Sequence, residues 1–166
     1  DIQRKRVGIG SRVFIRRSND VIPEILSAVE GDVPERQVEK PTVCPACGAH
    51  VEHRGVHLYC TNSLSCAPQI AGRLAHYASR DAMDIDTFSE KTAALFVEEL
   101  KLKSIPDLYD LGPQDYMGLQ GFGERRINNL MAAIERSKDC TLGAFIFAIG
   151  IPNVGAKTAK DLARRF

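Results

Sequence analysis

The sequence predicts an α+β fragment made of several small domains in series: a short β-rich unit, a cysteine-rich loop and a mainly α-helical domain. Three observations predict this arrangement. Alternating apolar residues and turn signals fill about the first 40 residues, four cysteines lie between residues 44 and 66, and apolar residues recur at helical spacing from residue 70 onward. With 166 residues and 44% apolar content, the chain is large enough to build a hydrophobic core.

The first unit is predicted to be a pair of strands. Residues 7–17 and 21–29 have the alternation and apolar content of β-strands. Gly10-Ser11 and Asn19-Asp20 are turn signals, and Pro23 indicates a strand start or a sheet edge. Two strands are too few to close a barrel. The polar, proline-containing segment that follows is interpreted as an exposed connection.

Charge is balanced over the chain but not along it. There are 22 basic and 21 acidic side chains, a formal net charge of +1, which excludes a polycationic tail. Residues 20–39 are acidic, whereas residues 1–17 are basic, and the basic segment either contacts phosphate or forms a solvated strand face. No apolar run approaches ~18 residues, and we expect no signal peptide and no membrane contact. The basic residues of the first segment are Arg4, Lys5, Arg6, Arg12, Arg16 and Arg17.

Cys44, Cys47, Cys60 and Cys66 have the spacing of a metal-binding loop. Two residues separate the first pair, twelve residues follow, and five residues separate the second pair. Thiolates at such spacings can reach the corners of a tetrahedron around Zn²⁺, and Gly48 allows a sharp turn after the first pair. Four cysteines leave no open coordination position. The sequence therefore predicts a structural zinc site, not a catalytic one.

Two other interpretations of the cysteines are open. Two disulfides would suit a small secreted protein, but a chain of this size can fold without them. A Cys₃His site could instead use His57 and leave one cysteine free, and His50 and His53 are also close in sequence. Cys140 stands apart from the other cysteines, and it is predicted to be a small buried apolar residue.

The second half of the chain is predicted to be helical. Pro68 suits the first turn of a helix, a second helix is expected from about Ser89 to Leu102, and Gly150 suits a helix C-terminus. Apolar residues then recur with helical spacing, which we interpret as core contacts between helices. These stripes are Ile70, Leu74 and Tyr77; Leu95, Phe96 and Leu100; Ile127, Leu130, Met131 and Ile134; Leu142, Phe145, Ile146 and Ile149; and Ala159, Leu162, Ala163 and Phe166.

A glycine-rich turn, Leu119-Gln120-Gly121-Phe122-Gly123, is predicted to join two helices, the second starting at about Glu124. This is the pattern of a helix-hairpin-helix. The two glycines let the backbone approach an external group, while Phe122 is expected to turn inward and anchor the turn. The next helix would present its free N–H groups and positive dipole end to an anion such as a phosphodiester, which it would hold without reading bases.

The same pattern recurs at similar spacing. Ile151-Pro152-Asn153-Val154-Gly155 precedes a helix with Lys157 and Lys160, and Asn153 can adopt the left-handed conformation of a glycine. Ile85-Asp86-Thr87-Phe88-Ser89 has the same layout without either glycine. We therefore expect this turn to pack in the same way but to bind phosphate much more weakly. Recurrence every 32 to 34 residues predicts stacked helical pairs. The alternative is a helical bundle with glycine-rich packing turns.

Together, these motifs resemble the back half of bacterial NAD⁺-dependent DNA ligases, and the resemblance covers essentially the whole chain. Ser18-Asn19-Asp20-Val21-Ile22-Pro23 is similar to the family's oligonucleotide-binding (OB) segment, which normally has Ala-Gly before Asp-Val-Ile-Pro. The four cysteines match its zinc finger, and Cys66-Ala67-Pro68-Gln69 resembles its Cys-Pro-Ala-Gln closure with the middle pair reversed. Residues 83–89, 119–123 and 149–155 align with successive hairpins of its helical domain.

The resemblance implies the sealing of nicks in duplex DNA during replication and repair. In the family, a lysine in Lys-x-Asp-Gly, in a preceding adenylation domain, takes AMP from NAD⁺ and passes it to the 5′-phosphate, and the full-length enzyme needs Mg²⁺. No lysine of this chain is followed by x-Asp-Gly. We therefore expect a portion of an enzyme that has no catalytic or NAD⁺-binding residues of its own and is inactive alone. Its implied work is to help encircle nicked DNA.

The resemblance also implies three domains: a partial OB-fold segment at residues 1–40, a Cys₄ zinc finger at 41–68 and a helix-hairpin-helix DNA-binding domain at 69–166. The chain begins without methionine and its last helical pattern is unfinished, so we expect a fragment of a longer protein. We expect one structural Zn²⁺ per chain, a monomer, and a bacterial cytoplasmic location at the nucleoid. The residues expected to contact DNA are Gly121, Phe122, Gly123, Arg125, Arg126, Asn153, Val154, Gly155 and Lys157.

Two alternatives belong to other functional classes. The chain could be a non-catalytic zinc-finger and helix-hairpin-helix DNA-binding module of a repair nuclease or topoisomerase. It could also be a protein-interaction module whose hairpins are only packing turns. Duplex binding at two salt concentrations separates the second alternative from the others, because phosphate contacts make affinity salt-dependent.

Overall fold

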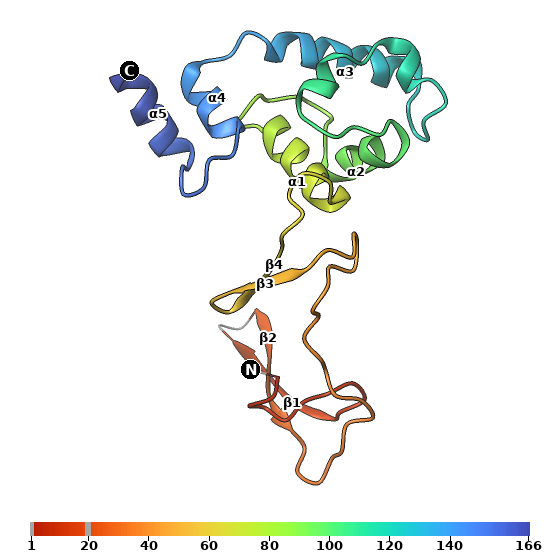
Figure 1. Ribbon diagram of the computed structural model, residues 1–166, viewed down its shortest axis with the longest axis vertical. Coiled ribbons are helices and arrows are strands. Elements are labelled where there is room, and N and C mark those ends of the chain that lie inside the picture. The colour runs from red at the N-terminus through yellow and green to blue at the C-terminus, as the bar shows by residue number, and fades with distance from the viewer. Residues whose placement is uncertain (1, 19–20) are drawn as a thin grey trace. The chain divides into compact units, whose positions relative to one another are not determined.

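The computed structural model describes residues 2–18 and 21–166, and it divides into two compact units, Asp1–Thr42 and Val43–Phe166 (Figure 1). Within the described residues the fold is α+β, with two separate two-stranded antiparallel sheets and five α-helices. The α+β prediction is therefore confirmed.

The first unit contains one hairpin of strands, β1 (Val13–Ser18) and β2 (Ile22–Ala28). Their antiparallel register pairs Val13 with Ala28 and Ser18 with Ile22, with an irregularity between Phe14 and Ile15. The predicted turn at Asn19-Asp20 lies outside the described residues.

The first strand begins six residues later than the sequence predicted. The cause is a tight approach of two loops: a Cβ on Gly8 would lie 2.5 Å from the Pro34 Cβ and 2.6 Å from the Arg36 carbonyl oxygen. Gly10 also has a φ of +84°, which breaks an extended strand. Residues 7–12 are therefore irregular, with a turn at Gly10 and an isolated bridge between Ile9 and Arg36.

The second unit begins with a small sheet and continues with helices. The strands β3 and β4 pair in antiparallel fashion, from Val51 opposite Cys60 to Arg54 opposite His57. The elements are β3 (Val51–Arg54), β4 (His57–Cys60), α1 (Ala67–Ala78), α2 (Glu90–Glu99), the 3₁₀ helices η1 (Pro106–Tyr109) and η2 (Pro113–Tyr116), α3 (Glu124–Ser137), α4 (Leu142–Ala148) and α5 (Ala156–Arg165).

The main core lies among the helices of the second unit. The stripes predicted on α1 and α3 are confirmed, because Leu74 and Leu130 are fully buried and their helical neighbours pack with them. At the centre, the Phe96 ring lies 5.5 Å from the rings of both Tyr116 and Phe122, close enough for favourable aromatic packing. This aromatic group joins α2, η2 and the turn before α3 into one body.

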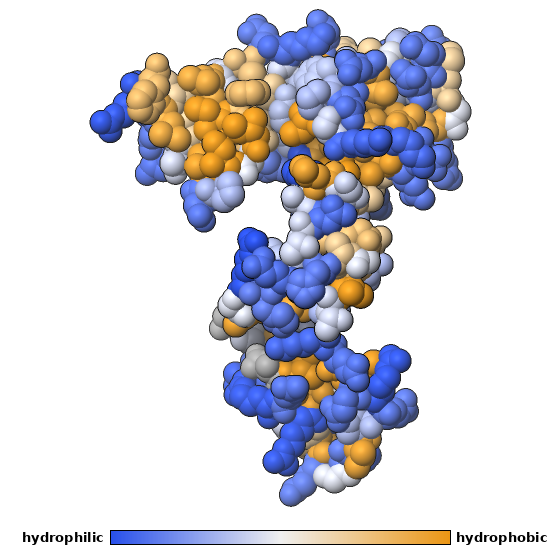
Figure 2. Space-filling view, in the orientation of Figure 1, coloured by the Kyte–Doolittle hydropathy of each residue, from blue (hydrophilic) through white to orange (hydrophobic). Residues whose placement is uncertain are grey.

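The apolar stripe predicted on α4 is not its buried face. Leu142, Phe145 and Ile149 are 52%, 43% and 46% exposed, and apolar residues gather over α4 on the face shown in Figure 2. The buried positions are Gly143 and Ala148. A Cβ on Gly143 would lie 3.3 Å from the Lys160 Cα, so the small residue lets α5 approach closely.

Three other predictions are also wrong in detail. Phe166 lies beyond the end of α5 and is 92% exposed, so it makes no core contact. Helix α2 ends at Glu99, because Lys101 has a φ of +57° and turns Leu102 back into the core. Cys140 is exposed, not buried, because it lies in the short connection between α3 and α4.

Among the described residues, no helix combines the length and apolar content needed to cross a membrane.

Candidate metal centre and nucleic-acid interface

The four predicted cysteines converge on one point. Their sulfur atoms all lie within 4.8 Å of one another, with Cys44 and Cys66 buried and Cys47 and Cys60 half-buried. The Cys44–Cys66 sulfurs are 4.0 Å apart and the Cys47–Cys60 sulfurs 3.5 Å apart, far beyond the ~2 Å of a disulfide bond. The structure therefore contradicts the disulfide interpretation, and among the described residues the cluster contains no histidine.

The cluster fits a tetrahedral metal ion. Zinc–sulfur bonds of about 2.3 Å place the sulfurs of a tetrahedral site about 3.8 Å apart, which matches the observed separations. The backbone N–H groups of Ala46 and Cys47 donate toward Cys44 and lower its pKa to about 7, so one thiolate forms readily. Burial raises the pKa of Cys66. A bound cation would reverse that effect, because a coordinated thiol loses its proton.

Local backbone geometry holds the cluster and joins it to the first helix. Gly48, with a φ of +70°, donates its N–H to the Cys44 carbonyl at 2.8 Å and closes the turn predicted after the first pair. Cys66 is the N-cap of α1, and the predicted Pro68 lies in its first turn. The Gln69 side chain donates to the carbonyls of Cys60 and Asn62, each at 3.2 Å. The metal loop is therefore continuous with the helical core.

The three predicted hairpins have the same backbone conformation. Thr87, Gly121 and Asn153 have φ angles of +68°, +79° and +64°, all in the left-handed region. One residue later, each turn closes with an N–H···O=C bond to the residue three positions earlier, at 3.3, 3.1 and 3.1 Å. The repeat predicted from the sequence is thus present in the backbone, even where threonine or asparagine replaces glycine.

The hairpins differ at the residue that starts the following helix. Ser89, Gly123 and Gly155 all have extended backbone as the N-caps of α2, α3 and α5. The Ser89 hydroxyl accepts the Thr92 N–H at 3.3 Å, so a side chain satisfies part of the α2 N-terminus. Neither glycine can supply such a cap, and no neighbouring atom lies within 4 Å of where a Cβ would stand. The N-termini of α3 and α5 are therefore open to an external anion.

The middle residue of each hairpin anchors the turn. Phe88 and Phe122 are 7% and 8% exposed, so the inward orientation predicted for Phe122 is confirmed. Val154 is half-buried in the corresponding position. A Phe122 side chain in the core cannot touch DNA, and its part in any phosphate contact is limited to its backbone.

The basic residues near the open N-termini have two kinds of environment. Arg125 and Lys157 are exposed beside the starts of α3 and α5. Arg126 is partly buried: its guanidinium stacks 4.0 Å above the Phe122 ring and donates to the Gly121 carbonyl at 3.1 Å and the Thr92 hydroxyl at 3.1 Å. This link to Thr92 could not be predicted from the sequence, because Thr92 is a buried polar residue that belongs to no apolar stripe.

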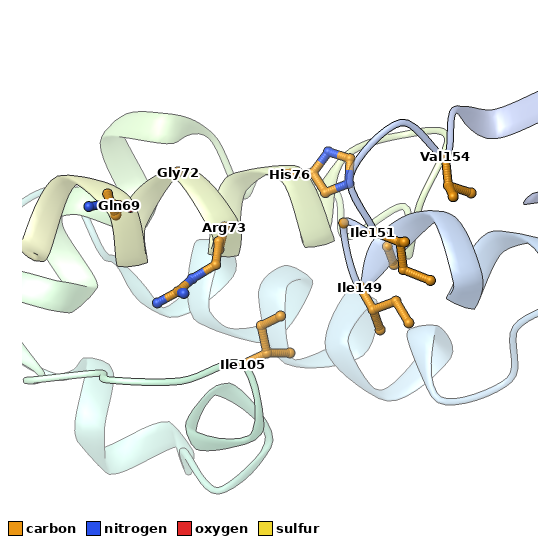
Figure 3. Close-up of a pocket in the computed structure, with 10 residues that line it drawn as sticks. Gln69, Gly72, Arg73, His76, Ile105, Ile149, Ile151 and Val154 are labelled. Atoms are coloured by element: carbon orange, nitrogen blue, oxygen red, sulfur yellow. The ribbon is translucent and has the colours of Figure 1, made fainter. Parts of the chain in front are cut away.

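Helix α4, which leads into the third hairpin, rests on α1 through a histidine. A ring nitrogen of His76 lies 2.9 Å from the Phe147 carbonyl oxygen, and the His76 and Phe147 rings meet edge to face at 4.7 Å. Figure 3 shows His76 at the edge of a cavity of about 430 Å³, with Ile149 and Ile151 beside it. The cavity is lined by α1, Ile105 and residues 148–154, so we interpret it as a packing gap beside this hairpin.

Comparison with known proteins places DNA ligases among the relatives of this chain. It is 57% identical over 167 residues to a DNA ligase of Alkaliphilus metalliredigens, 54% over 171 residues to one of Clostridium perfringens, and 52% over 167 residues to DNA ligase 2 of Clostridium acetobutylicum. Each alignment covers 100% of this chain and 25% of the relative, so the chain spans about a quarter of the length of these curated relatives. No protein-family model matches the chain. The resemblance to bacterial DNA ligases is therefore confirmed.

Proposed function

We propose that this chain, which matches about a quarter of the length of bacterial DNA ligases, is the DNA-binding portion of an NAD⁺-dependent enzyme that seals nicks in replication and repair. The open N-termini of α3 and α5, each with a glycine at the N-cap position and no side-chain cap, are the observation that carries this proposal. Each offers backbone N–H groups and a positive dipole end to a phosphodiester. Both hairpins belong to the same unit, Val43–Phe166, so the chain would grip more than one point of the DNA backbone.

The charges around these N-termini support a phosphate ligand. Arg125 and Lys157 are exposed, and each is the second residue of its helix, so each can meet a phosphate bound at the N-terminus. The N-terminal glycine turn approaches the backbone of DNA and not its bases, so binding would be independent of sequence. The first hairpin, whose N-cap hydroxyl already satisfies the Thr92 amide, would contribute little.

The metal would be one structural Zn²⁺, held by Cys44, Cys47, Cys60 and Cys66. When bound it supplies cross-linking and no chemistry, because four thiolates fill a tetrahedral site. Its work would be to fix residues 44–66 and the N-cap of α1 against the helical domain. We further propose that residues 1–40 are part of an OB-fold, 41–68 the zinc finger and 69–166 a helix-hairpin-helix domain.

The chemistry of nick sealing would come from residues outside this chain. No lysine here stands in Lys-x-Asp-Gly, so the chain lacks the group that would take AMP from NAD⁺. Incubation with NAD⁺ and Mg²⁺ should leave its mass unchanged. A stable gain of one AMP would show that a nucleophile is present after all. We expect the chain to be a monomer acting in the bacterial cytoplasm at the nucleoid.

The test of DNA binding is fluorescence anisotropy with nicked and intact duplexes of unrelated sequence at several salt concentrations. The chain should bind all sequences alike, with affinity falling as salt rises. Arg125→Ala and Lys157→Ala should each flatten the log–log salt dependence by about 0.9, the value for one lost phosphate contact on B-DNA. Salt-independent binding, or none, would favour the alternative in which the hairpins are packing turns of a protein-interaction module.

A further inference from the structure

The first two hairpins are related by a local pseudo-symmetry that places two side chains in equivalent positions. Thr92 follows Phe88 by four residues, and Arg126 follows Phe122 by four residues. Each donates to the carbonyl of the left-handed residue five positions earlier: the Thr92 hydroxyl to Thr87 at 3.4 Å, and Arg126 to Gly121 at 3.1 Å.

These two equivalent side chains also bond to each other. The other arm of the Arg126 guanidinium donates to the Thr92 hydroxyl at 3.1 Å, a contact between residues 34 apart in sequence. The hydroxyl can accept this bond while it donates to Thr87, since it has one hydrogen and two lone pairs. A continuous chain of hydrogen bonds therefore runs from the Thr87 carbonyl to the Gly121 carbonyl and joins the left-handed residues of both hairpins.

The remaining contact of Arg126 fixes the anchor of the second hairpin. Its guanidinium lies 4.0 Å above the Phe122 ring, which in turn packs against Phe96 of α2. Such stacking on an aromatic face is favoured by the planar guanidinium and weakens when lysine replaces arginine. One side chain thus holds the backbone carbonyl, the anchor ring and the neighbouring hairpin together.

We infer that Arg126 is a positioning residue that braces the phosphate-binding hairpin at Gly121–Gly123 against the first hairpin, and that it is not itself a phosphate ligand. The inference rests on the proposed function of that hairpin. It also gives the first hairpin a role. Helix α2, which follows Thr87–Ser89, is already capped by Ser89, so this hairpin supports its neighbour and does not bind DNA itself. Arg125, one residue earlier and exposed, is the phosphate contact.

The salt dependence of DNA binding separates a brace from a ligand. Arg126→Ala should weaken binding about tenfold at every salt concentration with an unchanged log–log slope, because the lost bonds are internal. Arg125→Ala, the matched control, should flatten the slope by about 0.9. Arg126→Lys keeps the charge but not the planar fork, so it should weaken binding as Arg126→Ala does. Thr92→Val should weaken binding too, and combined with Arg126→Ala it should add less than its single effect.

Amide hydrogen exchange without DNA tests the brace independently of the proposed function. The Phe122 N–H, bonded to the Leu119 carbonyl at 3.1 Å, should exchange about tenfold faster in Arg126→Ala and in Thr92→Val. The Val154 N–H, in the equivalent bond of the third hairpin, is the internal control and should not change. A flattened slope with unchanged Phe122 exchange would make Arg126 a phosphate ligand and overturn the inference. Failure of the parent chain to bind DNA would overturn only the proposed function, because exchange still decides the brace.

Discussion

Replacing Gly123, the N-cap of α3, separates DNA binding from folding. Its φ is −85°, an ordinary value for any residue, and a Cβ would meet nothing within 4 Å. Gly121 is less suitable, because its φ of +79° strains any side chain and a Cβ would lie 3.4 Å from a nitrogen of Arg126. Three substitutions form the series: Gly123→Ser, Gly123→Asn and Gly123→Asp.

All three residues cap helices at least as well as glycine, so α3 should be stabilised by a few tenths of a kcal/mol. Ser89 shows the geometry in this chain, since its hydroxyl accepts the amide three residues on at 3.3 Å. A capping oxygen would occupy the N–H groups that phosphate needs. Hydrogen bonds to charged groups contribute about 1.5–3 kcal/mol each, so losing one should weaken binding by about tenfold or more.

The comparison of Gly123→Asp with Gly123→Asn separates the effect of negative charge from the effect of a capping oxygen that occupies the backbone N–H groups. Two like charges about 4 Å apart repel by about 1 kcal/mol in water and more near a protein surface, so Gly123→Asp should bind about fivefold more weakly than Gly123→Asn. Anisotropy at several salt concentrations measures affinity, and thermal unfolding by circular dichroism measures stability. Ser89→Asp, at the hairpin that already has a cap, should change affinity little. The reasoning is refuted if Gly123→Asp melts no lower than the parent and binds nicked duplex as tightly.

Three further predictions concern the zinc site, the exposed Cys140 and the buried Tyr116. The purified chain should carry one zinc, and elemental analysis without zinc would contradict this. Because metal binding to such sites contributes on the order of 10 kcal/mol, a chelator should disorder residues 44–66 and lower the stability of α1. The exposed Cys140 should be the one cysteine that reacts rapidly with a thiol reagent in the zinc-loaded protein, and Cys140→Ser should abolish that fast phase without changing the melting temperature. Tyr116→Phe should be neutral or stabilise by about 1 kcal/mol, because the buried Tyr116 hydroxyl has no hydrogen-bond partner among the described residues. Burial raises the pKa of Tyr116 from 10.0 to about 12, so the stability that its neutral form contributes is complete below pH 10.0 and is lost as pH rises toward about 12. Denaturant unfolding at alkaline pH should therefore show a smaller loss of stability in Tyr116→Phe than in the parent chain. An equal loss would contradict the assignment.

Local features of the fold could be predicted because they depend on short stretches of sequence. The metal cluster needs only the spacing of four cysteines and the turn at Gly48. The three hairpins need only a residue that tolerates positive φ, then an apolar anchor, and even Thr87 adopts that conformation. The start of α3 at Glu124 and the inward Phe122 follow from the same local pattern.

Features that join distant segments were decided only by tertiary structure. Spacing alone assigned Leu142, Phe145 and Ile149 to the core, whereas the buried positions are Gly143, which α5 approaches closely, and Ala148, which packs in the main core. A stripe of apolar residues shows that a helix has an apolar face, but another segment must cover that face to bury it.

The two arginines at the start of α3 show the same division. Arg125 and Arg126 are adjacent and chemically identical, and by sequence both are candidate phosphate contacts. Successive helical residues point about 100° apart, so one side chain faces solvent while the other meets Thr92 and the Phe122 ring. The sequence by itself determined that the second hairpin is basic, and only the packing of the two hairpins decided which arginine is exposed and which is held by internal contacts.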